Sequence, residues 1–372
     1  MNCAHLFLFV FVWLAPSFMN AQPSSQEQPL TSSYLQDLEE LGYCVIPQLF
    51  STRETELLYQ RIWHEYVEKA WPNCKMDDRS NWKEVFPEHN PFGIFNGLAG
   101  HTQVMWDLRQ DPRIVNVFAQ IWNTSDLIVS MDGISLMCPP EIKEIHLEPW
   151  PHVDQATMRP KDNVAHNNNP PVGFISESLL RTQPFTIQGQ FLFEDSFVGD
   201  GGFYCIPKSH LRFNEFAPEL EVLSALEVSP KERSKFKHDY VLNFFSHSSD
   251  KSGNPYCMKQ ITAPRGSLIL WDSRTIHWNQ RPSKDRPYDK NAKVRMVGYL
   301  CYVPKTRLTE EGKAIRKRAF EIGATTGHNP TQPEIKVSKD HVSQEFEQYL
   351  EDPSCTQQKI HLTPLGESLL GL

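Results

Sequence analysis

Hydrophobic positions follow two different spacings along the chain, and these predict where helices and strands lie. Apolar residues three and four apart predict helices at 34–41, 52–70, 112–122 and 309–323 and near 340–350. Short apolar runs predict strands at 43–47, 127–131, 185–194, 202–206, 267–272 and 295–303. Helices mostly toward the two ends, with strands between them, predict a mainly β member of the α+β class with a central sandwich or barrel.

Residues that commonly begin or end helices lie at the ends of the predicted helices. Ser51 and Glu54 form the pattern of a capping box before the helix at 52–70, and Gly42 follows the helix at 34–41. The sequence has no internal repeat, no regular alternation of strand and helix and no glycine-rich phosphate loop. It therefore argues against a dinucleotide-binding fold and a P-loop fold.

The composition is that of a globular protein and narrows the function classes. Hydrophobic residues make up 40% of the chain, and the net charge is −8 without a block of Lys or Arg, so no nucleic-acid partner is expected. The 8 cysteines show no C-x-x-C spacing, which argues against a zinc finger and a disulfide scaffold. Cys44, Cys205 and Cys301 lie within apolar runs and are expected in the core.

Residues 1–21 are predicted to be a signal peptide. The uncharged apolar run from Leu6 to Ala15 is too short to span a bilayer comfortably, and Ala21 before Gln22 fits a cleavage point. No stable membrane span is expected. The predicted location is the secretory pathway, in the endoplasmic reticulum lumen or outside the cell. The alternatives are an uncleaved apolar tail or anchor, and a cytoplasmic protein.

Two short segments carry candidate metal ligands. His152 and Asp154 are two residues apart, so in an extended segment they face the same side and can reach one metal ion. His277, at the end of an apolar run, is the candidate for a third ligand. Two histidines and one carboxylate are typical of non-haem Fe(II) oxygenases. His146 and Glu148 have the same spacing as the first pair, and spacing alone does not choose between them.

An oxygenase that uses 2-oxoglutarate also needs a cation for the far carboxylate of that co-substrate, and Arg suits bidentate pairing. Arg295 begins a predicted strand. If this strand returns antiparallel to the one that ends at His277, Arg295 lies beside that histidine. Asn279, two residues after His277, would face the same side. Arg281 and Arg286, in the intervening loop, are the alternatives.

At 35–305 the sequence resembles the phytanoyl-CoA dioxygenase family of Fe(II)- and 2-oxoglutarate-dependent oxygenases. The similar segments are G-Y-C-V-I-P at 42–47, W-P-H-V-D-Q at 150–155, I-Q-G-Q at 187–190, G-G-F-Y-C-I-P-K-S-H at 201–210 and W-D-S-R-T-I-H-W-N at 271–279. The second of these resembles the family's iron motif, which favours His152 over His146. Lys208 stands where the family usually has Gly.

The resemblance implies a double-stranded β-helix, or jelly roll, with flanking helices. The oxygenase domain would cover 33–305 and a helical extension 306–372. The implied reaction uses O2 to hydroxylate an unactivated C–H bond of a small or lipid-like molecule, with release of succinate and CO2. Fe(II) would be bound by His152, Asp154 and His277, with 2-oxoglutarate as co-substrate and ascorbate as a further candidate cofactor.

Several points stay open in the sequence. Gln188 and Gln190 share one face of a predicted strand and are candidates to contact the co-substrate if that face points inward. The family's arginine usually follows the distal histidine more closely than Arg295 does here. An apparent insertion rich in Lys, Asp and Pro separates them, so Arg286 remains an alternative. The rival functions are a jelly-roll binding protein that has lost iron, and a cupin-like isomerase or sugar-binding protein.

Asn123 provides a test of the predicted compartment, because it begins an N-glycosylation sequon with Thr124 and Ser125. In a eukaryotic cell the chain should enter the endoplasmic reticulum and become glycosylated at Asn123. Glycosidase treatment should then increase its mobility on a gel, and Asn123→Gln should abolish the change. A cytosolic product with an intact N-terminus would contradict the prediction.

Overall fold

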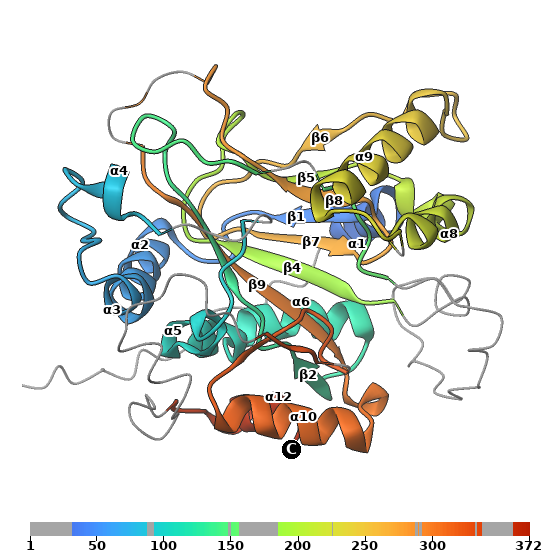
Figure 1. Ribbon diagram of the computed structural model, residues 1–372. Helices are drawn as coiled ribbons and strands as arrows, with labels where there is room; N and C mark the ends of the chain where they lie inside the picture. The colour runs from blue at the N-terminus through green and yellow to red at the C-terminus, as the bar shows by residue number, and fades with distance from the viewer. Residues whose placement is uncertain are drawn as a thin grey trace, which may run out of the picture.

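Two antiparallel β-sheets lie at the centre of the protein, with helices around them (Figure 1). The computed structural model describes residues 32–87, 93–147, 150–155, 185–224, 226–286, 289, 292–331, 333–336 and 360–372. The strands are β1 (Tyr43–Ile46), β2 (Leu127–Val129), β3 (Ile134–Met137), β4 (Ile187–Leu192), β5 (Gly202–Cys205), β6 (Lys259–Gln260), β7 (Leu268–Asp272), β8 (His277–Gln280), β9 (Arg295–Pro304), β10 (Thr325–Thr326) and β11 (Ile335–Lys336). The larger sheet has six strands, in the order β1-β7-β4-β9-β2 with β3 also paired to β9, and the smaller sheet has the order β6-β5-β8.

Helices flank both sheets and lie mostly before and after the central strands in the chain. They are α1 (Ser32–Leu41), α2 (Thr52–Ile62), the π-helix η1 (Trp63–Val67), α3 (Glu68–Ala70), α4 (Trp82–Val85), η2 (Ala99–His101), α5 (Gln103–Arg109), α6 (Pro112–Trp122), η3 (Ser209–Arg212), α8 (Phe213–Ser224), α9 (Pro230–Ser246), η4 (Lys305–Arg307), α10 (Glu310–Glu321) and α12 (Pro364–Leu370). Mixed helices and antiparallel sheets confirm the α+β class.

The predicted elements are found, with two kinds of difference. Each of the six predicted strands overlaps an observed one, whereas the strands β3, β6, β8, β10 and β11 and the helices α4, α5, α8, α9 and α12 were not predicted. The helix predicted near 340–350 and the signal peptide predicted at 1–21 lie outside the described residues. The missed strands are short, so each offers too few alternating positions to stand out in the sequence.

The register of β4 shows which side chains face the smaller sheet. Gln190 lies opposite Ile269 on β7 and Tyr299 on β9, and directly opposite residues share a face. Ile269 and Tyr299 belong to an apolar cluster that includes Phe203 of the smaller sheet. Gln190, and Gln188 two residues before it, therefore point into the space between the sheets. This is the inward orientation left open in the sequence.

Helices cover the outer face of each sheet. On the larger sheet, the Phe118 ring of α6 packs on Tyr302 of β9 at a centroid distance of 4.5 Å, and the Trp122 indole donates to the Tyr302 carbonyl at 2.7 Å. On the smaller sheet, Trp278 of β8 packs in a cluster with Phe216 of α8. Figure 1 shows α5 and α6 below the larger sheet and α8 and α9 beside β5 and β8. Aromatic rings thus pack on the outer face of each sheet, while the space between the sheets holds polar side chains beside an apolar cluster.

The helix predicted at 52–70 is confirmed at its start and interrupted further on. The Ser51 side chain accepts from the Glu54 backbone N–H, and the Glu54 side chain accepts from the Ser51 N–H at 2.8 Å. A π-helical turn at Trp63–Val67 then interrupts the α-helix. Within it Trp63 is buried and stacks on Trp82 at a centroid distance of 5.1 Å. The π-helical turn, which the spacing of apolar residues did not predict, thus coincides with the packing of Trp63 in the core.

The turn that follows β5 contains Lys208 and His210. Lys208 adopts a left-handed backbone conformation with φ 67°. Its ammonium group forms an ion pair with Asp250 at 2.6 Å. His210 is buried, and its Nε2 lies 2.9 Å from the Glu39 carbonyl oxygen. His210 therefore connects the turn to α1.

Two further expectations concern cysteines and membranes. Cys44, Cys205 and Cys301 are buried free thiols, which confirms them as core residues. Burial raises the pKa of the Cys74 thiol to about 12, so that group stays protonated at neutral pH. Among the helices within the ranges given above, none combines the length and the apolar character that a membrane span requires.

A buried arginine holds the C-terminal segments of the chain together. Arg316 of α10 is fully buried, and its guanidinium donates to the carbonyls of Leu369 at 3.0 Å and Leu370 at 2.9 Å. It also donates to the Pro330 carbonyl at 3.2 Å. A cation at the C-terminal end of α12 satisfies carbonyls that the helix leaves unpaired and interacts favourably with the helix dipole. Arg316 thus joins three parts of the extension.

Replacing Arg316 should therefore destabilise the protein. Arg316→Ala leaves buried carbonyls without donors, so the free energy of unfolding should fall by about 3 kcal/mol. Arg318, exposed on the same helix, is the matched control, and Arg318→Ala should change it by less than about 0.5 kcal/mol. Chemical denaturation of both variants measures the difference. Equal effects would show that the buried hydrogen bonds are not responsible.

Candidate metal centre

A backbone bridge brings the two candidate metal-binding segments together. The His152 N–H donates to the His277 carbonyl at 3.1 Å, and the His277 N–H donates to the His152 carbonyl at 3.0 Å. The Asp154 N–H donates to the carbonyl of Ser273, just after β7, at 3.0 Å. These bonds fix the backbone positions from which the three side chains extend. The segment at 150–155 is therefore held against the start of β8.

The three side chains converge on one point. Asp154 Oδ2 lies 3.1 Å from His277 Nε2, and Asp154 Oδ1 lies 3.4 Å from His152 Nε2. One ligand atom from each residue lies within 4.8 Å of the other two. His277 is buried and the other two are partly buried. Such a group suits a divalent metal ion that prefers imidazole nitrogen and carboxylate oxygen, as Fe(II) does.

Second hydrogen bonds orient both imidazoles. His152 Nδ1 lies 3.0 Å from the Trp150 carbonyl oxygen, and His277 Nδ1 lies 2.9 Å from the Thr275 carbonyl oxygen. Because a carbonyl only accepts, Nδ1 carries the proton in each ring, and Nε2 keeps its lone pair for a metal. The motif supplies this partner itself, since each carbonyl comes from the residue two positions before the histidine.

The surroundings favour a charged carboxylate at Asp154 and a neutral ring at His152. Burial would raise the pKa of Asp154, but His328, His152 and His277 together hold it well below its ordinary value. Burial, with a contribution from His277, lowers the pKa of His152. Both directions favour the protonation states in which these groups bind a metal.

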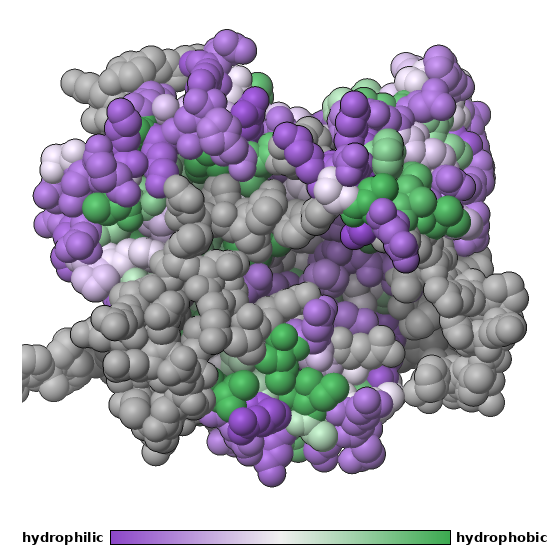
Figure 2. Space-filling view, in the orientation of Figure 1, coloured by the Kyte–Doolittle hydropathy of each residue, from purple (hydrophilic) through white to green (hydrophobic). Residues whose placement is uncertain are grey.

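Aromatic rings enclose the two histidines. The Trp150 indole stacks on His152 at a centroid distance of 4.0 Å and an angle of 14°. Trp271 and Phe203 approach His277 with centroid distances of 5.3 Å and 5.7 Å. These contacts limit rotation of the rings and exclude water from one side of the centre. Figure 2 shows a hollow with a hydrophilic floor on the face of the molecule that is seen in Figure 1.

The competing motif does not take part in this cluster. His146 is exposed, and within the residues that the structure describes the cluster contains only His152, Asp154 and His277. Glu148, its partner in the motif, lies outside the described residues. The backbone bridge explains the difference, because it places 152–154 and not 146 beside β8.

Arg295 lies between the sheets, although the reason given from the sequence is wrong. Its strand, β9, does not pair with β7 or β8, because β4 lies between β7 and β9 and β8 pairs with β5. Arg295 nevertheless extends from the face that β9 turns toward β5. It is 5% exposed, its Nη2 lies 3.5 Å from Gln190 Oε1, and burial lowers its pKa.

Gly202 on β5 makes room for the Arg295 guanidinium. A Cβ atom at position 202 would overlap Nε and Cζ of Arg295. The backbone there has φ 96°, a conformation that residues with side chains rarely adopt. Both observations indicate that Gly is required at this position, and they show that Arg295 reaches across to the smaller sheet.

Polar side chains near Arg295 complete the inner surface. Asn279 of β8 is buried and donates to the Tyr299 hydroxyl at 2.8 Å. Gln188 is buried too, and among the described residues its Nε2 has no hydrogen-bond partner. The larger sheet and β8 thus present amides, a hydroxyl and a guanidinium to one space.

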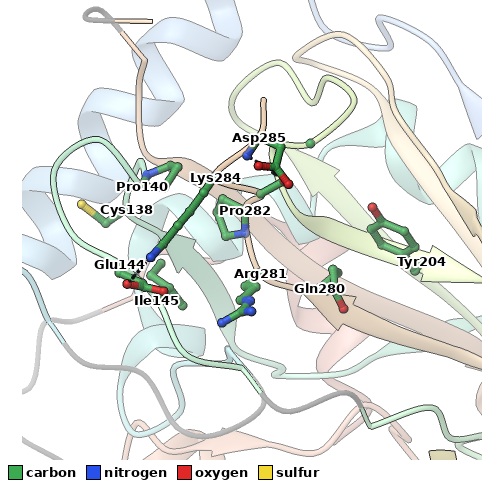
Figure 3. Close-up of a pocket in the computed structure, with 12 residues that line it drawn as sticks. Cys138, Pro140, Glu144, Ile145, Tyr204, Gln280, Arg281, Pro282, Lys284 and Asp285 are labelled. Carbon is green, nitrogen blue, oxygen red and sulfur yellow. Dashed lines mark hydrogen bonds and ion pairs between the residues drawn. The ribbon is translucent and has the colours of Figure 1, made fainter. Parts of the chain in front are cut away.

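Arg286 is engaged elsewhere. Its guanidinium forms an ion pair with Asp200 and another with Glu141 at 2.7 Å. Arg281, the other alternative, is exposed. A cavity of about 490 Å³ beside the outer face of β8 is lined by Arg281 and Lys284 (Figure 3). A second cavity, of about 230 Å³, is lined in part by Arg295. Of the three arginines, Arg295 is thus the one that lies between the sheets.

Sequence reasoning missed His328 and Asp132. His328, between β10 and β11, lies with Nε2 3.3 Å from Asp154 Oδ1. Asp132, between β2 and β3, lies close enough to His328 to interact with it electrostatically. Burial raises the pKa of Asp132, and His328 offsets part of that rise. Neither residue shares a short motif with the ligands, so no spacing in the sequence indicated them.

Comparisons with known proteins give distant similarities. No family model matches the sequence. "Ava biosynthesis cluster protein O" of Aspergillus versicolor is 28% identical over 260 residues, which cover 68% of this chain and 71% of that protein. The non-heme alpha-ketoglutarate-dependent carbocyclase SnoK aligns with a TM-score of 0.41 and 14% identity over 74% of this chain and 86% of SnoK. HygX of Streptomyces hygroscopicus, solved with nickel and 2-oxoglutarate, aligns with a TM-score of 0.41 and 13% identity over 74% of this chain and 88% of HygX.

The three candidate ligands predict a direct binding experiment. His152→Ala, Asp154→Ala and His277→Ala should each lower the affinity for Co(II), a spectroscopic substitute for Fe(II), by more than about a hundredfold, because each removes one of three ligands. His146→Ala is the control and should retain the affinity of the unaltered protein. Titration followed by visible absorption provides the measurement. Loss of binding in His146→Ala but not in His152→Ala would reverse the assignment.

Proposed function

We propose that this protein is an Fe(II)- and 2-oxoglutarate-dependent oxygenase related to the phytanoyl-CoA dioxygenase family. The observation that carries the proposal is the pairing of a two-histidine, one-carboxylate cluster with a buried arginine between the same two sheets. The cluster would bind the metal ion, and the arginine would bind a carboxylate of a dicarboxylate co-substrate. These residues are far apart in the sequence, and folding brings them between the same two sheets.

The arrangement of the sheets supports a double-stranded β-helix. A six-stranded antiparallel sheet faces a three-stranded one across a shared apolar cluster, and helices cover the outside. Consecutive strands alternate between the sheets over part of the chain, since β4 and β7 belong to the larger sheet and β5 and β8 to the smaller. Such alternation is the feature expected of jelly rolls.

The residues present fit both groups that the proposal requires. His152, Asp154 and His277 would hold Fe(II) and leave coordination positions for other ligands. Arg295 would hold the far carboxylate of 2-oxoglutarate, with Gln190 and Asn279 as neighbouring polar groups. When bound, the iron and its co-substrate would supply the oxidative chemistry that hydroxylates a C–H bond and releases succinate and CO2.

Electrostatics favours an anion beside Arg295. The guanidinium is buried, and it forms no ion pair within the part of the chain that the structure describes. A buried cation without an anionic partner is costly, and a carboxylate that arrives with its own charge removes that cost. The ion pairs of Arg286 with Glu141 and Asp200 make that residue a poor alternative, because its charge is already neutralised.

The proposed substrate is a small molecule. The similarity to a protein of a biosynthesis cluster supports a substrate of that kind. A lipid-like molecule is the alternative, and the predicted secretory location makes an acyl-CoA substrate less favourable. Metabolite profiling with and without the enzyme would identify the compound that gains oxygen.

Replacing Arg295 tests the proposed co-substrate site. Arg295→Ala should raise the apparent KM for 2-oxoglutarate by on the order of a hundredfold, because a charge-assisted bidentate pair is lost. Arg295→Lys should restore part of the loss, since an ammonium group supplies charge without the planar fork. Succinate formation at varied 2-oxoglutarate, with Fe(II) and ascorbate present, gives the KM values. Co(II) affinity should stay within about twofold in both variants.

Arg286 is the comparison for that experiment. Arg286→Ala should leave the KM for 2-oxoglutarate nearly unchanged. Its free energy of unfolding should nevertheless fall by about 3 kcal/mol, because Glu141 and Asp200 lose their partner. If Arg286→Ala carries the KM effect and Arg295→Ala does not, the co-substrate site is misassigned. If the unaltered protein never forms succinate from 2-oxoglutarate, the proposed function is wrong.

A further inference from the structure

We propose that His328, in the C-terminal extension, is a positioning residue of the metal centre that donates a hydrogen bond to Asp154. The inference rests on the proposed function, because it concerns the same metal site. His328 Nε2 lies 3.3 Å from Asp154 Oδ1, and His277 Nε2 lies 3.1 Å from the other oxygen, Oδ2. His152 Nε2 lies 3.4 Å from Oδ1 as well, so this oxygen has one neighbour from the ligand group and one from outside it.

The carboxylate needs such a partner. The Asp154 side chain is 11% exposed, so an oxygen that does not bind the metal has little access to water. The Asp154 and Gln155 backbone N–H groups both donate to the Ser273 carbonyl and are not available to the carboxylate. Hydrogen bonds to a metal-binding carboxylate fix its orientation and strengthen metal binding. In the described part of the chain, His328 is the ion-pairing partner of Asp154 that is not itself a proposed ligand.

His328 stands outside the ligand group itself. The described residues with ligand atoms mutually within 4.8 Å are His152, Asp154 and His277, and His328 is not among them. Its side chain is also 41% exposed, compared with 7% for His277. The geometry thus gives His328 contact with a ligand rather than a position as a fourth ligand.

A firmly attached backbone supports His328 from one side. The Thr325 N–H donates to the Gly97 carbonyl at 2.7 Å, and the Thr326 N–H donates to the Met131 carbonyl at 2.8 Å. The Thr326 hydroxyl also accepts from the Met131 N–H at 3.2 Å. Both threonines are fully buried. The segment before His328 is therefore fixed to the loop before β3.

The other side of the segment is attached as well. The Gly327 N–H donates to the Glu334 carbonyl at 2.9 Å, and the Pro330 carbonyl accepts from the buried Arg316 at 3.2 Å. Asn329 Oδ1 accepts from the Thr331 N–H at 3.0 Å. A side chain on such a segment is preorganised toward Asp154, and this gives the extension at 306–372 a part in the site.

Co(II) binding by the full chain without 2-oxoglutarate tests the proposal. His328→Ala should weaken Co(II) binding by about ten- to hundredfold, the usual loss when a partner of a metal ligand is removed. The shape of the Co(II) visible spectrum should stay the same, because the ligands are unchanged. His328→Gln should recover most of the affinity, since its amide N–H can also donate.

His361→Ala is the matched control, because His361 lies in the same extension and its side chain is exposed. It should bind Co(II) as the unaltered protein does, and thermal unfolding should confirm that all variants fold. Unchanged affinity in His328→Ala would overturn the proposal. So would a changed Co(II) spectrum with no recovery in His328→Gln, which would make His328 a ligand. If the unaltered folded protein binds no Co(II), both the positioning role and the proposed function are wrong. If the unaltered protein binds Co(II) and His328→Ala binds it equally well, only the positioning role is wrong.

Discussion

The site depends on the pair of backbone hydrogen bonds between His152 and His277. This bridge joins a segment that follows β3 to the first residue of β8, and it brings a carboxylate and two imidazole nitrogens to one point. Both Nδ1 atoms face carbonyl oxygens, so the Nε2 lone pairs point toward one another and toward Asp154. Such an arrangement of partly buried acceptors is unfavourable until a cation occupies it. The backbone therefore prepares a site that favours metal binding.

A complementary constraint acts at Arg295. Its guanidinium lies between the sheets, and Gly202 leaves the room that it needs. The cluster of His152, Asp154 and His277 favours binding of a cation, and Arg295 favours binding of an anion. A dicarboxylate that chelates iron at one end and pairs with arginine at the other satisfies both requirements. The larger sheet supports this arrangement by burying its apolar residues against helices, so that amides from β4 can face the interior.

The sequence predicted the local features of the site better than their arrangement in space. His152 and Asp154 were found because residues two apart in an extended segment face the same side. The capping box at Ser51 is likewise a local pattern. The neighbour assigned to the strand of Arg295 was wrong because strand order depends on long-range pairing, with β4 inserted between β7 and β9. His328 was missed for the same reason. It reaches Asp154 only through the buried attachment of the extension, which no spacing records.

The most direct test is anaerobic addition of Fe(II) and then 2-oxoglutarate to the full chain, followed by visible absorption. A keto acid that chelates ferrous iron produces a charge-transfer band, which reports metal and co-substrate in one site. The account predicts that the band appears with stoichiometric 2-oxoglutarate and disappears on exposure to O2 as succinate forms. A folded protein that binds Fe(II) but shows no band at saturating 2-oxoglutarate would contradict the central claim.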